Sequence, residues 1–279
     1  MIISRKFKFA FIHNPKVAGT SIRHSIEKYH DYPQRFWHQA WSSEAERTVD
    51  TAHIPFPDLP AEVKATLSSC FTFGFVRNPI NRFWAGLAEF RRQHADWPVS
   101  KLSADELLLT WLTPANVRHD WRFTHFCPQH YFFYEGNKRR ADYIGRHESF
   151  EADWTRIQQL VGIKFDQLNN SRHRVALGDE LLSAEAYTAF MRLYARDYVV
   201  FGYDTLAGDT NCGGQPLMHH ERVDFIHKPG LTIDDVVMAT MTMGERVAYL
   251  ERQVNHYRSC LTILENRLGV DAYQASGDQ

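Results

Sequence analysis

Two stretches of the chain share one pattern: a short apolar run, an Asn-Pro pair, and then apolar positions at helical spacing. In the first stretch, residues 7–12 are apolar at all but one position and are followed by Asn14 and Pro15. The next apolar residues recur every three or four positions, at Ile22, Ile26 and Tyr29. A short apolar run favours a buried strand, and this later spacing favours a helix. We therefore predict a strand, a tight loop and a helix.

The second stretch begins with an apolar run at residues 70–76, which Asn78 and Pro79 interrupt. Residues 82–91 then carry apolar side chains on one helical face, at Phe83, Leu87 and Phe90. This is again the pattern of a strand, a turn and a helix. Two such units in one chain predict an α/β fold, in which an open parallel sheet is flanked by helices.

The segment between these units is less regular. Residues 51–56 form a short run bounded by prolines at positions 55, 57 and 60, which exclude a helix and predict a strand tip. His53 is therefore expected at a strand end, where α/β proteins tend to place functional groups. Residues 30–50 are expected to be a loop and irregular segment, and residues 163–165 are strand-like.

The composition changes after Tyr203. Residues 207–232 are rich in glycine, proline and polar side chains, and we predict a linker there. A helix is predicted from about Thr232, which is a suitable N-cap residue. Its apolar positions alternate at spacings of four and three, at Met243, Val247, Leu250, Val254, Tyr257, Leu261, Leu264 and Leu268.

This heptad pattern predicts a coiled coil and therefore a homo-oligomer. The alternative is an amphipathic helix that folds back on its own domain. The chain is thus divided into a domain at residues 1–206, a linker at residues 207–232, and a C-terminal helix with a polar tail at residues 233–279.

Composition narrows the class of protein. The 279 residues are 44% apolar and 23% charged, which fits a soluble globular protein. The net charge of −1 gives no overall attraction to nucleic acid or anionic lipid, and no apolar run is long enough to span a membrane. The four cysteines are scattered and the fifteen histidines contain no H-E-x-x-H pattern, so we expect a cytoplasmic, metal-free protein.

The loop of the first unit has the composition of an anion cradle: Lys16, Val17, Ala18, Gly19, Thr20 and Ser21. A loop at this place directs backbone N–H groups and the positive end of a helix dipole at one spot. It differs from the nucleoside-triphosphatase loop, in which lysine directly precedes the hydroxyl residue. Because Arg77 and Arg82 stand at the second turn, we expect one ligand with two phosphate groups, held at the ends of neighbouring strands.

Together these motifs resemble those of the sulfotransferase superfamily. The segments PKVAGTS at residues 15–21 and FVRNPINRFWAGL at residues 75–87 are most similar to its carbohydrate-type branch. Three further motifs of that branch follow in order: HFCPQ at residues 125–129, YIGRHE at residues 143–148 and YARDYVVFGY at residues 194–203. The resemblance covers residues 5–206 and implies a P-loop-like core.

The resemblance also implies 3′-phosphoadenosine-5′-phosphosulfate as the sulfuryl donor. The loop at residues 16–21 would hold its 5′-phosphosulfate, and Arg77 would bind its 3′-phosphate. Ala85 stands where the branch has a serine that grips this phosphate, and a lost hydrogen bond to a charged group is worth about 1.5–3 kcal/mol. A replacement is expected from the loop at residues 169–174, through Ser171, Arg172 or Arg174; the alternative is a solvated basic loop.

Roles in transfer follow from the same resemblance. Lys16 would stabilise charge on the leaving phosphate. His53 is the first candidate for the base, since its position matches the region where carbohydrate 2-O-sulfotransferases place a catalytic histidine, and a pKa of about 6.5 suits proton removal. His125 is the second candidate, with acceptor contact as its expected role. Glu148 is expected to orient a cation such as Arg146.

The expected acceptor is a hydroxyl of a carbohydrate or glycan-like molecule. Basic and aromatic residues are candidates for its cleft, although scattered surface charge explains them equally well: Arg91, Arg92, Trp97, Arg118, Trp121, Arg122, Tyr131, Lys138, Arg139 and Arg140. Two other functions stay open. One is a nucleotide kinase or triphosphatase on the same core, and the other is a non-catalytic oligomeric scaffold with a decayed donor site.

Overall fold

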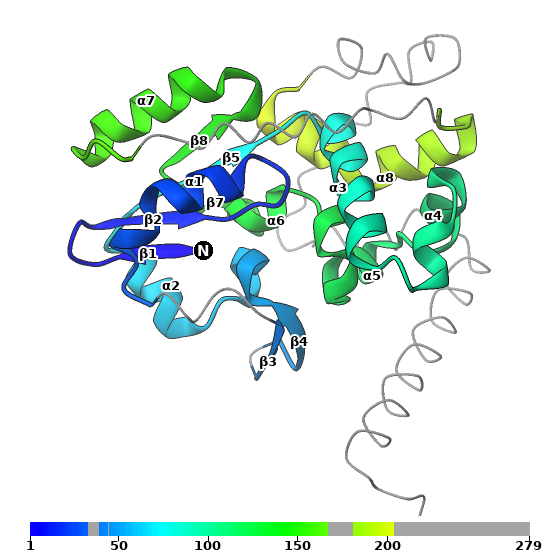
Figure 1. Ribbon diagram of the computed structural model, residues 1–279, viewed down its shortest axis with the longest axis horizontal. Helices are drawn as coiled ribbons and strands as arrows, with labels where there is room; N and C mark the ends of the chain where they lie inside the picture. The colour runs from blue at the N-terminus through cyan, green and yellow to red at the C-terminus, as the bar shows by residue number, and fades with distance from the viewer. Residues whose placement is uncertain (33–38, 44, 167–180, 204–279) are drawn as a thin grey trace, which may run out of the picture. The chain divides into compact units, whose positions relative to one another are not determined.

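A four-stranded sheet in the order β1-β2-β5-β8 lies at the centre of the fold (Figure 1). The computed structural model describes residues 1–32, 39–43, 45–166 and 181–203, all within one compact unit, Met1–Val223. The strands of the sheet are β1 (Ile2–Ser4), β2 (Phe9–Ile12), β5 (Phe71–Val76) and β8 (Tyr143–Arg146). The last three run parallel, while β1 pairs antiparallel with β2. The predicted α/β fold with a parallel sheet flanked by helices is confirmed.

Strands β2 and β5 serve two cores because successive side chains of a strand point to opposite faces. Phe9 and Phe11 pack in one core with residues of α1 (Gly19–Ile26) and α7 (Phe150–Val161). Ala10 and Ile12 pack in the other core with residues of α2 (Ala61–Leu67) and α6 (His130–Phe133). Helices therefore cover both faces of the sheet (Figure 1).

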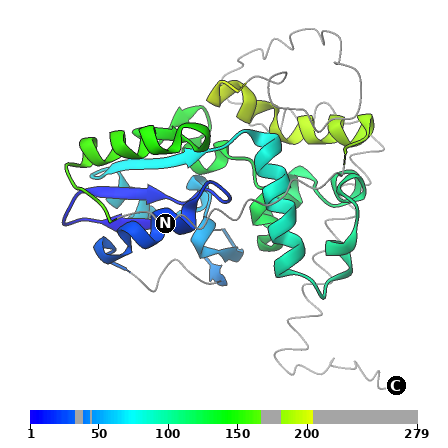
Figure 2. The same cartoon turned by 45° about the horizontal axis from the view of Figure 1, so that its top comes forward.

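A third core joins helices that Figure 2 shows grouped beside the sheet. It contains residues of α3 (Pro79–Gln93), α4 (Ala104–Thr110), α5 (Pro114–His119), η5 (Trp121–Phe126) and α8 (Ala184–Phe201). The HFCPQ segment runs from the end of η5 to Gln129, the residue before α6, and YARDYVVFGY forms the end of α8 and the two residues after it. Helix α3 starts at Pro79, three residues before its predicted start, because Pro79 suits the first turn of a helix.

The remaining elements are short. They are η1 (Glu27–Tyr29), β3 (Gln39–Ser42), β4 (Arg47–Asp50), η2 (Thr51–His53), η3 (Phe56–Asp58), η4 (Pro98–Lys101), β6 (Tyr134–Glu135), β7 (Lys138–Arg139) and η6 (His147–Ser149). Strands β3 and β4 pair as an antiparallel hairpin within the stretch that we expected to be irregular. The antiparallel edge strand β1 was not predicted.

Two predictions of extended structure are wrong. The stretch that contains His53 begins with a 3₁₀ turn, because the Asp50 side chain accepts a hydrogen bond from the Ala52 backbone N–H (2.9 Å) and closes it. His53 thus follows a strand of the β3–β4 hairpin and not a strand of the central sheet. Residues 163–165 form no strand, since Gly162 ends α7 with φ 72° and Phe165 turns into the core beside Trp154.

Several predictions lie outside the described residues. These are the linker at residues 207–232, the C-terminal helix with its coiled coil and oligomer contact, and the candidate donor ligands Ser171, Arg172 and Arg174.

Candidate functional site

The loop between β2 and α1 contains two residues in the left-handed region of backbone space. Lys16 has φ 64° and Ala18 has φ 68°, values that side chains other than glycine rarely adopt. Left-handed residues in a tight turn direct successive backbone N–H groups toward one point, which favours an anion. Helix α1 has no side-chain N-cap and no acidic residue in its first turn. The loop therefore has the backbone geometry that an anion cradle requires.

Two arginines of the β5–α3 corner contact this loop. Arg82 is 1% exposed, and it donates from Nε to the Pro15 carbonyl (3.0 Å) and from Nη2 to the Cys127 carbonyl (2.8 Å). Arg77 donates from Nη1 to the Lys16 carbonyl (3.4 Å). Because β2 and β5 are adjacent and parallel, the two predicted corners lie at the same edge of the sheet, as expected.

The β5–α3 corner has its own cap. The Asn78 side chain accepts hydrogen bonds from the backbone N–H groups of Ile80 (3.2 Å) and Asn81 (3.3 Å). The backbone N–H of Asn78 donates to Glu148 (2.7 Å). The other carboxylate oxygen of Glu148 accepts from the Tyr203 hydroxyl (2.9 Å). Glu148 thus supports the backbone of this corner. Its expected partner Arg146 donates instead to carbonyl groups at the end of α8.

The ammonium group of Lys16 forms an ion pair with Glu89 on α3 (Nζ to Oε2, 3.2 Å). Arg92 and Gln93 donate to the other oxygen of Glu89 and brace it from the next turn. Burial opposes the charge of Glu89, but the hydrogen bond from Arg92 and the nearby Lys16 outweigh it and lower its pKa to about 2. Glu89 is therefore ionised at neutral pH and competes with any anion for Lys16.

Three histidine rings gather at the start of the loop. The rings of His13 and His53 have centroids 4.3 Å apart, and those of His53 and His125 have centroids 5.6 Å apart. His53 Nδ1 lies 2.9 Å from the His13 carbonyl oxygen. A carbonyl can only accept, so Nδ1 carries the proton and, in the neutral ring, the lone pair is on Nε2.

Burial keeps this histidine cluster neutral. It lowers the pKa of His53 below 6.5, against the opposing effects of Asp50 and the His13 carbonyl. It lowers the pKa of His125 further, and the neighbouring His53 and Lys16 add to that effect. His125 is 6% exposed, whereas His53 is half-buried. The structure thus brings both predicted histidines to the Lys16 loop, with His53 more open to solvent.

Gly19 packs against this cluster. A Cβ atom at this position would lie 1.8 Å from His13 Nε2, so only glycine allows α1 to begin so close to the ring. Val17, by contrast, is fully buried in the core beneath the loop, and its side chain is a hydrophobic anchor. Of the predicted cradle, Val17 and Ala18 therefore contribute backbone groups only.

Sequence reasoning missed four residues around the two corners: His13, Glu89, Gln129 and Asp197. Gln129 hydrogen-bonds to Asn14 and to the Arg77 backbone, and Asp197 accepts from the Gln129 backbone N–H. Gln129 and Asp197 lie within the HFCPQ and YARDYVVFGY motifs, so the family pattern was a signal that could have identified them. Glu89 carries no such local signal, because it meets Lys16 across 73 residues of chain. His13 carries none either, because it meets His53 across 40 residues.

The structure supplies no hydroxyl at the position of the branch serine. Ala85 is 3% exposed in the chain's core, one helical turn before Glu89. Several candidate acceptor residues have intramolecular partners: Arg118 pairs with Asp58, Arg122 with Asp120, Arg92 with Glu89 and Arg140 with Glu135. Arg118 and Arg122 also lie over the rings of Tyr131 and Trp97. Much of the predicted basic surface is thus neutralised by nearby carboxylates.

The described residues contain neither a metal-ion cluster nor a membrane-spanning helix. Within residues 1–32, 39–43, 45–166 and 181–203, no cluster of three or more histidine, cysteine or acidic side chains is arranged to hold a metal ion. Among the helices of those same ranges, none combines the length and the apolar character needed to cross a membrane.

These features define an α/β protein with a P-loop-like strand-loop-helix corner at the carboxyl edge of its parallel strands. Comparison with known families gives the particular assignment. The model of the sulfotransferase family matches residues 1–204, and the chain belongs to this family. Comparison with curated proteins and with solved structures gives no match. Family membership supports a transferase enzyme that moves a sulfuryl group to a hydroxyl-bearing acceptor.

Proposed function

We propose that this protein transfers the sulfuryl group of 3′-phosphoadenosine-5′-phosphosulfate to a hydroxyl of a carbohydrate or glycan-like acceptor. Two adjacent corners support a donor with a phosphate at each end of its ribose. The Lys16 loop would hold the 5′-phosphosulfate, and the Arg77 guanidinium, whose Nη1 reaches the Lys16 carbonyl, would bind the 3′-phosphate.

The hydrogen bond from His53 Nδ1 to the His13 carbonyl carries this proposal. It leaves the lone pair of the neutral ring on Nε2, in a ring that lies 4.3 Å (centroid to centroid) from the His13 ring at the start of the loop that would bind the sulfuryl group. In an in-line transfer, Nε2 takes the proton of the acceptor hydroxyl while its oxygen bonds to sulfur. The bond from sulfur to the 5′-phosphate oxygen breaks, and adenosine 3′,5′-bisphosphate leaves with the negative charge.

Lys16 and the loop N–H groups would stabilise that leaving charge, an electrostatic role that needs no proton transfer. For this, the Lys16 ammonium must exchange Glu89 for the phosphate oxygen. His125 is more deeply buried than His53, which favours His53 as the base and leaves contact with the acceptor as the role proposed for His125.

The experiment is sulfuryl transfer from labelled donor to a panel of neutral and acidic glycans, with the wild type and His53→Ala. We expect His53→Ala to lower the rate by about 10²–10⁴-fold while binding of adenosine 3′,5′-bisphosphate is retained. His24→Ala, which changes an exposed histidine of α1, is the control and should transfer normally. A fully active His53→Ala would refute the proposed base.

The pH dependence gives a second test. Because burial lowers the pKa of His53, its ring is neutral at pH 7, and the wild-type rate should fall only below pH 6.5. Thermal stabilisation by adenosine 3′,5′-bisphosphate tests donor binding without an acceptor. No stabilisation would favour a scaffold with a decayed site, and magnesium-dependent ATP hydrolysis would favour a kinase or triphosphatase.

A further inference from the structure

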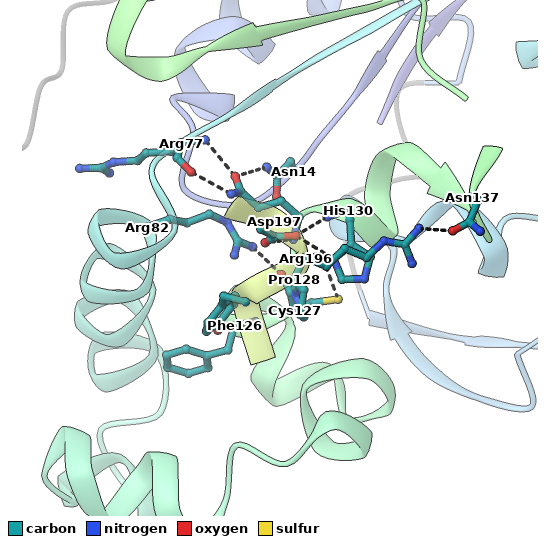
Figure 3. Close-up of polar contacts among 12 residues, drawn as sticks. Asn14, Arg77, Arg82, Phe126, Cys127, Pro128, His130, Asn137, Arg196 and Asp197 are labelled. Carbon is teal, nitrogen blue, oxygen red and sulfur yellow. Dashed lines mark hydrogen bonds and ion pairs between the residues drawn. The ribbon is translucent and has the colours of Figure 1, made fainter. Parts of the chain in front are cut away.

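The side-chain amide of Gln129 connects the ends of β2 and β5. Its Oε1 accepts from Asn14 Nδ2 (3.0 Å) and from the Arg77 backbone N–H (2.9 Å), and its Nε2 donates to the Arg77 carbonyl (2.8 Å). Asn14 also donates to the Phe75 carbonyl (2.9 Å), so it reaches β5 directly as well. Figure 3 shows Asn14 and Arg77 at the two ends of this set of contacts.

The backbone around Gln129 is itself held in place by Asp197 of α8. One oxygen of Asp197 accepts from the Gln129 backbone N–H (2.7 Å), and the other accepts from the His130 backbone N–H (2.9 Å) and contacts its ring nitrogen Nδ1 (2.7 Å). Gln129 and Asp197 are both fully buried, where hydrogen bonds are strong and an unpaired polar group is costly. A connected set of buried hydrogen bonds thus runs from α8 through Gln129 to both corners.

The chemistry of these contacts requires an amide. Two donors converge on Oε1 while one carbonyl accepts from Nε2, and a carboxylate or an apolar side chain cannot satisfy all three. These partners belong to the two segments whose positions set the distance between the corners. Asn14 directly precedes the loop with Lys16, and Arg77 is the cation of the second corner.

A ligand with two anionic groups gains both interactions only when the spacing of its two sites matches its own length. We infer that Gln129 is a positioning residue of the donor site, which sets the distance between the Lys16 loop and Arg77, and that Asp197 acts through it. This inference rests on the proposed function, since it takes the donor to have a phosphate at each corner.

The experiment compares two nucleotides by calorimetry. Adenosine 3′,5′-bisphosphate engages both corners, and adenosine 5′-monophosphate engages only the Lys16 loop. The wild type should bind the bisphosphate more tightly, and Gln129→Met should reduce this preference about tenfold or more while monophosphate binding changes little. A variant that was merely less stable would weaken both ligands alike, so the ratio of the two affinities isolates the effect on spacing.

Thr72→Val is the matched control. Thr72 is buried at the opposite end of β5, and its hydroxyl oxygen lies within hydrogen-bond distance of the Arg140 carbonyl (3.1 Å) and the Asp142 carboxylate (2.9 Å). Its loss should lower the melting temperature without changing the affinity ratio. If Gln129→Met does not fold, Asn14→Ala removes the β2 side of the connection, together with the direct hydrogen bond to the Phe75 carbonyl, and should reduce the ratio in the same direction.

The outcomes separate the two proposals. A wild type that binds both nucleotides equally would refute the donor assignment, and this inference with it. A wild type that prefers the bisphosphate, together with a folded Gln129→Met or Asn14→Ala variant that keeps the full preference, would overturn the role of Gln129 alone.

Discussion

The two corners of the site have the same secondary structure, but they differ in whether a side chain caps the backbone N–H groups at the start of the helix. At the β2–α1 corner, Lys16 and Ala18 adopt left-handed conformations, and no side chain caps α1. At the β5–α3 corner, Asn78 caps α3 through two backbone N–H groups, and Pro79 occupies the first helical position.

This difference indicates how each corner would recognise a phosphate. Left-handed residues other than glycine cost about 1–2 kcal/mol each, and such strain concentrates at functional sites. The first corner contains two such residues, and the backbone N–H groups that they direct would contact the proposed donor. The second corner uses two helix amides for its Asn78 cap, so recognition there would depend on the Arg77 side chain. The proposal thus pairs backbone recognition at one corner with side-chain recognition at the other.

Of the changes at the two corners, the largest effect is expected from removing the charge at the first corner. Lys16→Met should lower the rate of sulfuryl transfer by about 10²–10³-fold, because the leaving phosphate loses its stabilising cation. Initial rates with labelled donor measure this. Lys64→Met is the control, since Lys64 pairs with Glu135 away from the site (3.0 Å), and it should retain the wild-type rate. A Lys16→Met rate within a few-fold of wild type would show that the backbone N–H groups of the loop suffice to stabilise the leaving phosphate.

At the second corner, a change of the Arg77 side chain alone should weaken nucleotide binding. Arg77→Met should weaken adenosine 3′,5′-bisphosphate about 10–150-fold, the equivalent of a lost hydrogen bond to a charged group, and leave the 5′-monophosphate nearly unaffected. Calorimetric titration of both nucleotides measures this, with Arg23→Met as control because Arg23 of α1 pairs with Glu27, the first residue of η1. Equal losses for the two nucleotides would contradict the assignment of the 3′-phosphate to this corner.

The two helix starts should also differ in stability. Asn78→Ala should lower the free energy of unfolding by about 0.5–2 kcal/mol, since two backbone N–H groups lose their cap. Ala18→Gly should change it by less than about 1 kcal/mol, because relief of the left-handed strain offsets the greater entropy of the unfolded chain. Urea unfolding measures both. A larger loss for Ala18→Gly than for Asn78→Ala would reverse the comparison.

The smallest effect is expected from the carboxylate that competes for the first corner. Glu89→Gln should tighten binding of adenosine 3′,5′-bisphosphate up to about fivefold, because Lys16 no longer has to leave an ion pair. The low pKa of Glu89, about 2, keeps this competition present throughout the neutral range. Glu27→Gln provides the control, and unchanged or weaker binding by Glu89→Gln would contradict the competition.

Much of the fold could be predicted because its signals are local. The apolar runs that became β2 and β5, the Asn-Pro pairs and the helical spacing after them lie within short windows of sequence. His53 lies beside the His13 carbonyl at the end of β2, but Asp50 closes a 3₁₀ turn there in place of the predicted strand tip.

The sequence by itself determined the two strand-turn-helix units, their parallel arrangement and the cations at their turns, since periodicity and breaker residues act over a few positions. Only the tertiary structure decided which distant groups meet there. Gln129 contacts Asn14 across 115 residues, and Asp197 reaches Gln129 across 68. No local pattern encodes such pairs, because they depend on how the helices pack on the sheet. Since these groups are buried, an unpaired member of such a pair would be costly.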